Sequence, residues 1–265
     1  MIRFMNLFFI IAALALSITS SPKVYASTTV DIITFDITDN SNATPKDEEA
    51  PSAPQDVANE KIAYFTFDDG PTSDITDQIL DELKRLNIKA TFFVVGKEIY
   101  QKEDILKRIY NEGHSIGLHT YSHDYKKIYS SPDVFLQEMQ QTADYINEVL
   151  GTDANIKFIR FPGGSAGKLN QEFYDQIKSA GYTIFDWNVN LEDGVRPDAT
   201  VEELINNAKI VSNKIPERII LAHCNLNNKN TVKSIESIYE YYKAQGYTFA
   251  PINNNTKEFH YQFDK

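Results

Sequence analysis

From residue 61 onward, short apolar segments alternate with segments of helical periodicity, and this alternation constrains the fold more than any other feature. The apolar segments predict buried strands at 62–67, 90–95, 115–118, 156–161, 183–187 and 218–221. The periodic segments predict amphipathic helices at 74–86, 97–112, 132–150, 170–180, 201–213 and 231–244. Strands that alternate with helices form parallel βαβ units. Because no dinucleotide-binding fingerprint accompanies these units, the pattern favours an α/β barrel over an open sheet.

Several predicted helix boundaries have residues that start or stop helices. Ser131-Pro132 and Asn170 can open two of the helices, and Gly113 and Gly151 each follow a helix. In folds built from parallel βαβ units, the catalytic side chains lie at the carboxyl ends of the strands. The residues that directly follow the predicted strands are therefore the candidates for chemistry.

The first 26 residues predict a secretory signal peptide. Arg3 precedes an apolar run from Leu7 to Leu16, and small residues follow up to Ala26. A retained membrane anchor is the alternative, but the run is shorter than the roughly 20 apolar residues that a transmembrane helix needs. We expect cleavage after Ala26, no stable membrane span afterwards, and a secreted protein that is extracellular or associated with the cell wall.

Residues 27–60 predict a solvated stalk or linker that leads to a catalytic domain at 61–265. The segment holds eight acidic residues, one Lys and three Pro, and too few apolar side chains to offset the entropy of ordering it. The stretch from Val30 to Ile37 alternates enough to form a strand. A short element that docks on the domain is therefore the alternative to a stalk.

The charge and the cysteine content exclude two classes of site. The formal net charge of −11 argues against a nucleic-acid partner, because no basic surface large enough to neutralise many phosphates is expected. A single Cys excludes both an intramolecular disulfide framework and a zinc site built from several Cys. A metal in this chain would therefore need His and carboxylate ligands. The composition leaves the oligomeric state open.

Carboxylate and imidazole groups follow three of the predicted strands. Asp68 and Asp69 are adjacent in the sequence TFDDGP, where their repulsion disfavours them unless a cation or a functional proton is present; an ordinary Asp-Gly-Pro turn is the alternative. His119 and His123 lie four residues apart in HTYSH, so one face of a helical turn can present both imidazoles to one ion. His223 follows the last strand in LAHC. Three of the five His residues thus lie at strand ends, which favours a site over solvated loops.

Two further segments end predicted strands. In RFPGG, Arg160 places a cation beside flexible backbone whose N–H groups can face a ligand; a Pro-Gly turn with a surface Arg is the alternative. Trp187 is the only Trp of the chain and lies in a segment that ends in acidic residues, Asp193 among them. It is either a core residue or a platform for a sugar ring.

Taken together, TFDDGP, HTYSH, RFPGG, the segment 187–193 and LAHC resemble the polysaccharide deacetylases of the NodB-homology type, carbohydrate esterase family 4. The resemblance covers about residues 61–250. It implies a distorted (β/α) barrel that removes N- or O-acetyl groups from a glycan substrate. It also implies one divalent metal, usually Zn²⁺, with Co²⁺, Ni²⁺ or Mn²⁺ as alternatives.

The resemblance further implies metal ligands, a base with an orienting partner and an acid with an orienting partner. The matching residues are Asp69, His119 and His123 for the metal, Asp68 with Arg160 for the base, and His223 with Asp193 for the acid.

The chemistry fits these implied roles. Three protein ligands leave a position for water, and zinc lowers the pKa of bound water toward about 7. Asp68 would take the proton of this metal-bound nucleophile, and His223 would protonate the departing amine. The metal and the backbone N–H of Gly163 would stabilise the oxyanion. Leu221 and Trp187 are expected to contact the substrate.

Four positions depart from the family pattern. Gly163 stands where an aromatic residue is common and Gly194 where a second Trp is common, so we expect part of the cleft wall to be lost or built from elsewhere. Asn190 and Cys224 each replace an Asp. Cys224 is interpreted as a small buried residue, with a fourth ligand or a redox switch as the alternative. We expect these changes to tune substrate choice or rate.

The leading hypothesis is an exported, metal-dependent hydrolase of amide bonds that removes N-acetyl groups from cell-wall glycan, with the N-acetylglucosamine of peptidoglycan as the substrate. Chitin oligomers, N-acetylmuramic acid, other exopolysaccharides and acetylated xylan are alternative substrates. A catalytically weakened carbohydrate-binding protein on the same fold is the alternative from another class. A metal-dependent amidase or lyase of small cyclic substrates is a third hypothesis. The retention of Asp68 and His223 favours the deacetylase.

Overall fold

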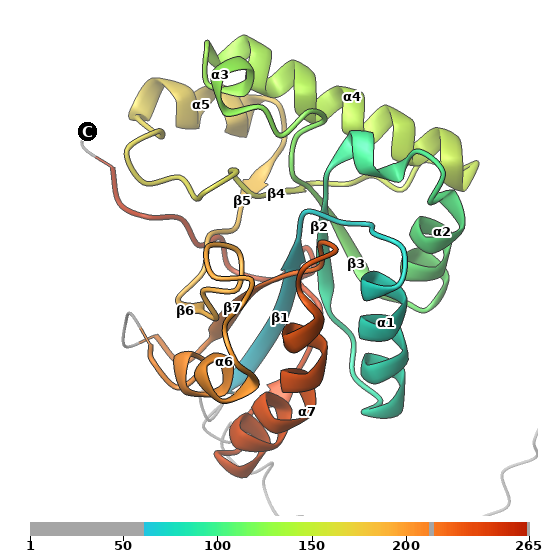
Figure 1. The fold of residues 1–265 in the computed structure, drawn as a ribbon. Coiled ribbons are helices and arrows are strands. Elements are labelled where there is room, and N and C mark those ends of the chain that lie inside the picture. Colours follow the sequence, from blue (N-terminus) through green and yellow to red (C-terminus); the bar gives the residue numbers. More distant parts are fainter. Residues whose placement is uncertain (1–60, 212–214, 264–265) are drawn as a thin grey trace, which may run out of the picture. The chain divides into compact units, whose positions relative to one another are not determined.

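A parallel sheet with β1 near its middle organises the structure, a computed structural model that describes residues 61–211 and 215–263 (Figure 1). Its strands follow the order β5-β4-β3-β2-β1-β7-β6, and β8 also pairs with β1. The bounds are Ile62–Asp68 for β1, Thr91–Val94 for β2, Ser115–Leu118 for β3, Phe158–Ile159 for β4, Thr183–Ile184 for β5, Val189–Asn190 for β6, Arg218–His223 for β7 and Thr248–Phe249 for β8. The predicted signal peptide and stalk lie outside the described residues.

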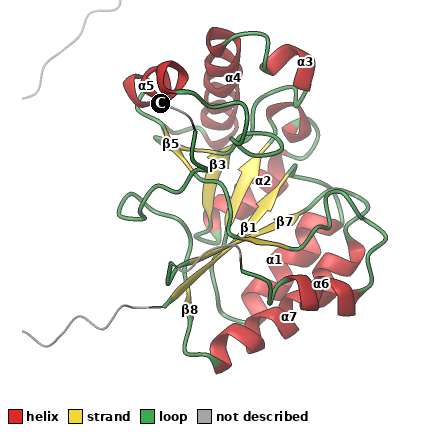
Figure 2. Ribbon diagram, turned by 90° about the vertical axis from the view of Figure 1, so that its left-hand side faces the viewer, coloured by secondary structure: helices red, strands yellow, loops and turns green. Residues whose placement is uncertain are grey.

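The helices pack beside the sheet in an order that follows the strands. Contacts link α6 to α7, α7 to α1, α1 to α2, α2 to α4 and α4 to α5, and Figure 2 shows α6, α7 and α1 side by side. Their bounds are Ile75–Arg85 for α1, Gly96–Ile99 for the 3₁₀ helix η1, Glu103–Asn111 for α2, Tyr125–Ile128 for α3, Pro132–Leu150 for α4, Gln171–Ser179 for α5, Val201–Asn207 for α6 and Lys229–Ala244 for α7. This arrangement is the predicted distorted (β/α) barrel. Among the described residues, no helix has the length and apolar character that crossing a membrane requires.

The predicted start and stop residues explain where several helices begin and end. The Ser131 side chain accepts a hydrogen bond from the Val134 N–H at the start of α4, and Gly151 ends this helix in the left-handed conformation. Asn170 caps α5 in the same way through the N–H of Phe173. The prediction of α4 at 132–150 is confirmed to the residue.

Two predicted helices differ from the structure. The segment 97–112 forms η1 and α2, separated by a turn in which Gln101 has a φ of 61° and its N–H donates to the Glu103 side chain. The predicted helix at 201–213 ends at Asn207, whose side chain donates to the Leu191 carbonyl and so joins the segment after β6. The first prediction missed this break, in which a side chain takes the place of a helical acceptor. The second prediction was too long.

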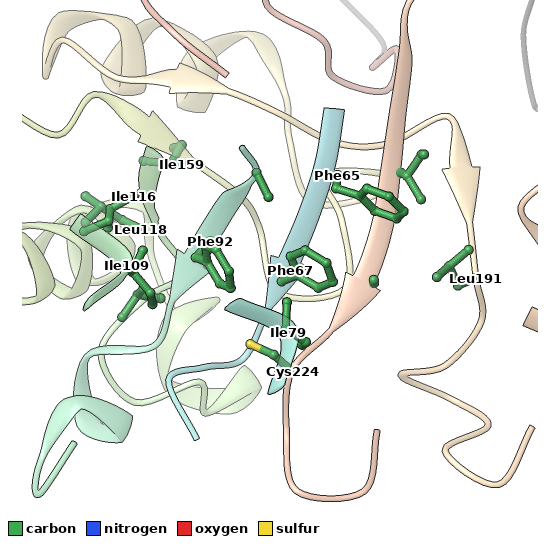
Figure 3. Close-up of a cluster of buried hydrophobic side chains, with 14 of the residues drawn as sticks. Phe65, Phe67, Ile79, Phe92, Ile109, Ile116, Leu118, Ile159, Leu191 and Cys224 are labelled. Carbon is green, nitrogen blue, oxygen red and sulfur yellow. The ribbon is translucent and has the colours of Figure 1, made fainter. Parts of the chain in front are cut away.

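The central strands are buried on both faces, as expected for strands between a helix layer and a filled barrel interior. Every β1 residue after Ile62 is buried. On one face, Phe65, Phe67 and Phe92 stack with ring centroids 5.7 and 5.3 Å apart (Figure 3). The strands whose ends form the site therefore rest on a close-packed base.

Candidate active site

The carboxyl ends of four strands bring the predicted motifs together. β1 ends at Asp68, which lies opposite His223 in the parallel register of β1 and β7. His119 follows the end of β3, and Arg160 follows the end of β4. The fold thus collects residues that are more than 150 positions apart in the sequence at one edge of the sheet.

Asp69, His119 and His123 form a group that could hold a metal ion, with ligand atoms that all lie within 4.8 Å of one another. The Asp69 Oδ1 is 3.6 Å from the His119 Nε2 and 3.3 Å from the His123 Nε2. The His119 Nδ1 lies 2.9 Å from the Arg160 carbonyl oxygen, which can only accept, so Nδ1 carries the proton and Nε2 is left for a metal. Two imidazoles and one carboxylate are a donor set that suits zinc.

Burial and backbone geometry both prepare these ligands. Burial lowers the pKa of His119 to about 3, which keeps the imidazole in the neutral form that binds metals. Asp69, Thr120 and His123 have φ values of 72°, 65° and 52°, a region that side chains other than glycine rarely adopt. Such strain is typical of functional sites.

Glu138 of α4 holds the loop that joins the two candidate His ligands, and sequence reasoning missed it. Its Oε2 accepts hydrogen bonds from the N–H groups of Tyr121 and Ser122, at 3.0 and 2.6 Å. Glu138 is buried, and Lys127 forms an ion pair with it. A charged residue in the middle of an amphipathic helix gives no sign in the sequence that it faces inward.

Asp68 is buried beside Arg160, as the predicted orienting pair requires. The Arg160 Nη1 donates to the Asp68 Oδ1 at 2.9 Å and to the Thr66 hydroxyl at 2.6 Å. The Nε donates to the Phe185 carbonyl at 2.7 Å, and the guanidinium lies 4.1 Å from the centre of the Phe93 ring. Burial raises the pKa of Asp68, and the charge of Arg160 opposes this rise.

Asp193 and His223 form the second predicted pair. The His223 Nδ1 lies 2.7 Å from the Asp193 Oδ1, and its backbone N–H donates to Oδ2 at 2.9 Å. The Thr231 hydroxyl donates to the same Oδ2 at 2.7 Å. Burial would lower the pKa of His223, but the hydrogen bond and charge of Asp193, with the charges of Asp68 and Asp69, raise it to about 9.

A cleft of about 300 Å³ opens between these groups. Its lining includes most of the predicted site residues, together with Tyr125, which was not predicted; the predicted ones are Asp68, Asp69, His119, His123, Gly163, Trp187, Leu221 and His223. Arg160 and Asp193 are buried behind it.

Tyr125 occupies the part of the cleft wall that we expected to be missing because residue 163 is a glycine. A Cβ atom at Gly163 would lie 2.9 Å from the Tyr125 hydroxyl, and Gly163 itself has a φ of 69°. The Tyr125 ring also lies edge-on to His123, with centroids 5.4 Å apart. The side chain comes from α3, so the wall expected at Gly163 is built by a different segment.

The loop with Gly163 is held by Asp186, another buried carboxylate. Its Oδ1 accepts from the Ser165 N–H at 2.9 Å, and its Oδ2 accepts from the Tyr261 N–H at 2.8 Å. The Tyr261 ring in turn packs edge-on against Trp187. The position of Trp187 in the cleft therefore depends on the C-terminal segment.

Gly194 lies directly against the His223 ring. A Cβ atom at this position would come within 2.4 Å of the His223 Cε1. The absence of a side chain at residue 194 thus makes room for His223, while Leu221 lines the cleft nearby.

Cys224 takes the buried position that was predicted for it. It is fully buried in the core cluster beneath the site (Figure 3). Its thiol donates to the Asp68 carbonyl at 3.2 Å, and burial raises the pKa of the thiol. A Cβ atom at Gly70 would lie 2.4 Å from its Sγ, so a small residue at 70 and a sulfur at 224 fit one another.

Fold and site together define an α/β-barrel protein with a candidate metal centre at the carboxyl edge of its sheet. The family model described as polysaccharide deacetylase matches residues 55–185. A peptidoglycan-N-acetylglucosamine deacetylase of Bacillus cereus is 31% identical over 193 residues, which cover 71% of this chain and 68% of that protein. This chain belongs to the polysaccharide deacetylase family, carbohydrate esterase family 4.

Solved structures agree with this assignment. The catalytic domain of a peptidoglycan N-acetylglucosamine deacetylase from Eubacterium rectale matches with a TM-score of 0.69 and 29% identity, over 77% of this chain and 94% of that one. A carbohydrate esterase family 4 enzyme from Streptococcus mutans matches with a TM-score of 0.68 and 32% identity, over 74% and 87% of the two chains. The predictions of the family, of its fold and of a polysaccharide-deacetylating hydrolase are confirmed.

Proposed function

We propose that this protein is an exported, metal-dependent deacetylase that hydrolyses the N-acetyl groups of cell-wall glycan, with the N-acetylglucosamine of peptidoglycan as its substrate. The observation that carries the proposal is the Asp69, His119 and His123 group, with Asp68 and His223 lining the same cleft. The names of relatives from Bacillus cereus and Eubacterium rectale support the choice of substrate.

Asp69, His119 and His123 would hold one divalent ion, and their donor set favours zinc over Co²⁺, Ni²⁺ or Mn²⁺. When bound, such an ion activates water and polarises a carbonyl group. The Arg160 carbonyl and Glu138 fix the His119 ring and the loop to His123, so the ligands are oriented before an ion arrives.

Asp68 is the proposed general base. The Arg160 guanidinium holds its Oδ1, which leaves Oδ2 for the proton of the attacking water. Burial raises the pKa of Asp68 and so makes the carboxylate a stronger base, while Arg160 keeps it ionised. The two opposite effects suit a group that must take up a proton and release it again.

His223 is the proposed general acid. Because Asp193 binds Nδ1, the Nε2 is the nitrogen left for the cleft. With its pKa raised to about 9, the imidazole carries a proton at neutral pH that it can deliver to the departing amine. Asp193 orients the ring and stabilises its charge.

The remaining cleft residues would bind the substrate. The N–H of Gly163 is the proposed donor to the oxyanion that forms on the acetyl carbonyl. Trp187 and Leu221 offer apolar surface to the sugar and its acetyl group, and Tyr125 closes the cleft beside Gly163.

The proposed domain layout follows from the sequence. Residues 1–26 would direct export and be removed, 27–60 would form an acidic stalk, and 61–265 would form the catalytic domain. An extracellular or cell-wall location would place the enzyme beside its glycan.

Acetate release by the purified chain from peptidoglycan, chitooligosaccharides and acetylxylan tests the proposal, with bound metal measured in the same samples. We expect release from peptidoglycan, loss with a chelator and recovery with added zinc. Asp69→Ala should lose the metal, whereas Asp68→Asn should keep the metal and lose activity. Asp144→Asn, an exposed residue of α4, is the matched control.

Two outcomes would contradict the proposal. An active Asp68→Asn variant would overturn the assignment of the base. If no glycan loses acetate in a metal-dependent way, the alternative of a carbohydrate-binding protein on this fold replaces the enzyme.

A further inference from the structure

A second cavity adjoins the cleft at the candidate metal centre. It has a volume of about 390 Å³ and shares Asp69 and His123 with the cleft. The Asn225 side chain closes one edge of the shared region, with its Nδ2 3.5 Å from the Asp69 Oδ2. A polymer whose reacting unit occupies the cleft would therefore place a neighbouring unit in this cavity.

The walls of the second cavity have the chemistry of a sugar site. Asn225 and Asn227 offer amide groups for hydroxyls, and Leu226 exposes 62% of its surface beside them. Apolar surface with a few polar groups is the usual composition of sites for small molecules and sugar units.

The cavity also has a net positive charge apart from the metal ligand Asp69. Lys97 and Lys102 line it together with Glu98. The Lys102 Nζ lies 3.5 Å from the Glu98 carboxylate, so this pair is neutral overall. The ammonium of Lys97 forms no ion pair within 4.0 Å among the residues that the structure describes, which leaves one positive charge.

We propose that this second cavity binds the sugar next to the reacting unit and that Lys97 selects a carboxylate on that sugar. One net positive charge matches a carboxylate better than a doubly charged phosphate. The inference rests on the proposed function, because it assigns a binding site to the neighbouring unit of the same glycan. In peptidoglycan, N-acetylglucosamine alternates with a sugar that has a lactyl ether, and this ether ends in a free carboxylate on units that have no peptide attached.

The test compares two glycan strands that differ only in charge. One carries the free lactyl carboxylate, and the other carries the same group as its methyl ester. The wild-type full chain should prefer the acid in kcat/KM, and this preference should shrink as salt rises to about 0.5 M, because salt screens exposed charges.

Lys97→Gln should reduce the preference for the acid about threefold to fivefold, the effect of losing one exposed ion pair. Lys97→Glu reverses the one unpaired charge and should abolish or reverse the preference for the acid. Lys84→Gln is the matched control, because Lys84 is an exposed residue in the last turn of α1, at the opposite edge of the sheet. The Lys84→Gln variant should prefer the acid over the ester as strongly as the wild type does.

Calorimetric binding of the two strands to the zinc-loaded full chain separates this inference from the proposed function. If no acetate is released but the acid binds more tightly than the ester in a manner that depends on Lys97, the carboxylate site stands and the proposed function fails. Equal binding of acid and ester, or a preference that survives in Lys97→Glu, overturns the carboxylate site.

Discussion

Two buried carboxylates of the candidate site, Asp68 and Asp193, are bound in different ways. Asp68 has one oxygen bound to Arg160, and its Oδ2 makes no hydrogen bond among the described residues. Asp193 has both oxygens occupied, by the His223 ring, its backbone N–H and the Thr231 hydroxyl. A carboxylate with one oxygen left can exchange a proton, whereas a fully bonded one can only position its partner. The bonding pattern thus fits the proposed roles of Asp68 as a reacting group and of Asp193 as a supporting one.

Replacing Arg160 should have the largest effect, because it removes the partner of a fully buried charge. We expect Arg160→Met to lower the free energy of unfolding by about 3–5 kcal/mol and activity by at least about 100-fold. Urea unfolding and acetate release measure the two losses. Arg160→Lys should be intermediate, since it keeps the charge but not the guanidinium bonds. If Arg160→Met unfolds at the same urea concentration as the wild type, the ion pair of Arg160 and Asp68 does not contribute to stability.

Asp193→Asn should remove the charge that raises the pKa of His223. It should leave the hydrogen bond between Arg160 and Asp68 intact. We expect kcat to fall by about 10²-fold to 10⁴-fold, with metal content unchanged. In the metal-free protein, His223 should titrate near pH 9 in the wild type. In the variant it should titrate at or below its ordinary pKa of about 6.5. NMR of the imidazole measures both values, and equal values would refute the role of Asp193.

The same shift predicts how stability depends on pH. A folded pKa of about 9, above the ordinary value for His, means that protonated His223 stabilises the metal-free fold. This contribution is complete below about pH 6.5 and is lost as the pH rises through about 9. Urea unfolding of the metal-free wild type should therefore show a loss in this range that Asp193→Asn lacks.

Gly194→Ala should displace the His223 ring without touching its charge. The added Cβ atom would meet Cε1 at 2.4 Å, so the ring must move. A displacement of about 1 Å can cost about 100-fold in rate, and we expect a fall of this size in kcat with KM nearly unchanged. A variant with full kcat would show that the ring position is not critical.

Tyr125→Ala should have the smallest of these effects, because it removes a wall and no reacting group. We expect kcat/KM to fall about tenfold, equivalent to about 1.4 kcal/mol. Tyr125→Phe should stay within about threefold if the ring rather than the hydroxyl is the contact. Tyr110→Ala is the control, an exposed Tyr on α2. Equal values for the two Ala variants would remove Tyr125 from the substrate site.

The sequence predicted the parts of the site that depend on strand ends, and it missed the parts that depend on packing between distant segments. The sequence predicted that Asp68 and His223 lie at the ends of two long strands, because each strand has a strong apolar pattern. The two-residue strands β6 and β8 are too short for any pattern and form only because neighbours offer hydrogen bonds.

Short elements and inward-facing polar residues explain the remaining misses. The one-turn helix α3 has too few residues for a periodic signal, so the approach of Tyr125 to Gly163 could not be predicted. Glu138 looked like any surface acid of an amphipathic helix. Its role depends on where the loop at 121–122 passes, which is a property of the tertiary structure.

Because β1 pairs with β7, we expect activity to appear late in folding. Asp68 and His223 face each other only when the first and the last long strands are side by side, a contact between opposite ends of the domain in sequence. Contacts of such separation form slowly, because a long loop must close first. A chain that emerges from a membrane in an unfolded state would therefore remain inactive until its C-terminal third has docked, and recovery of activity would report complete folding.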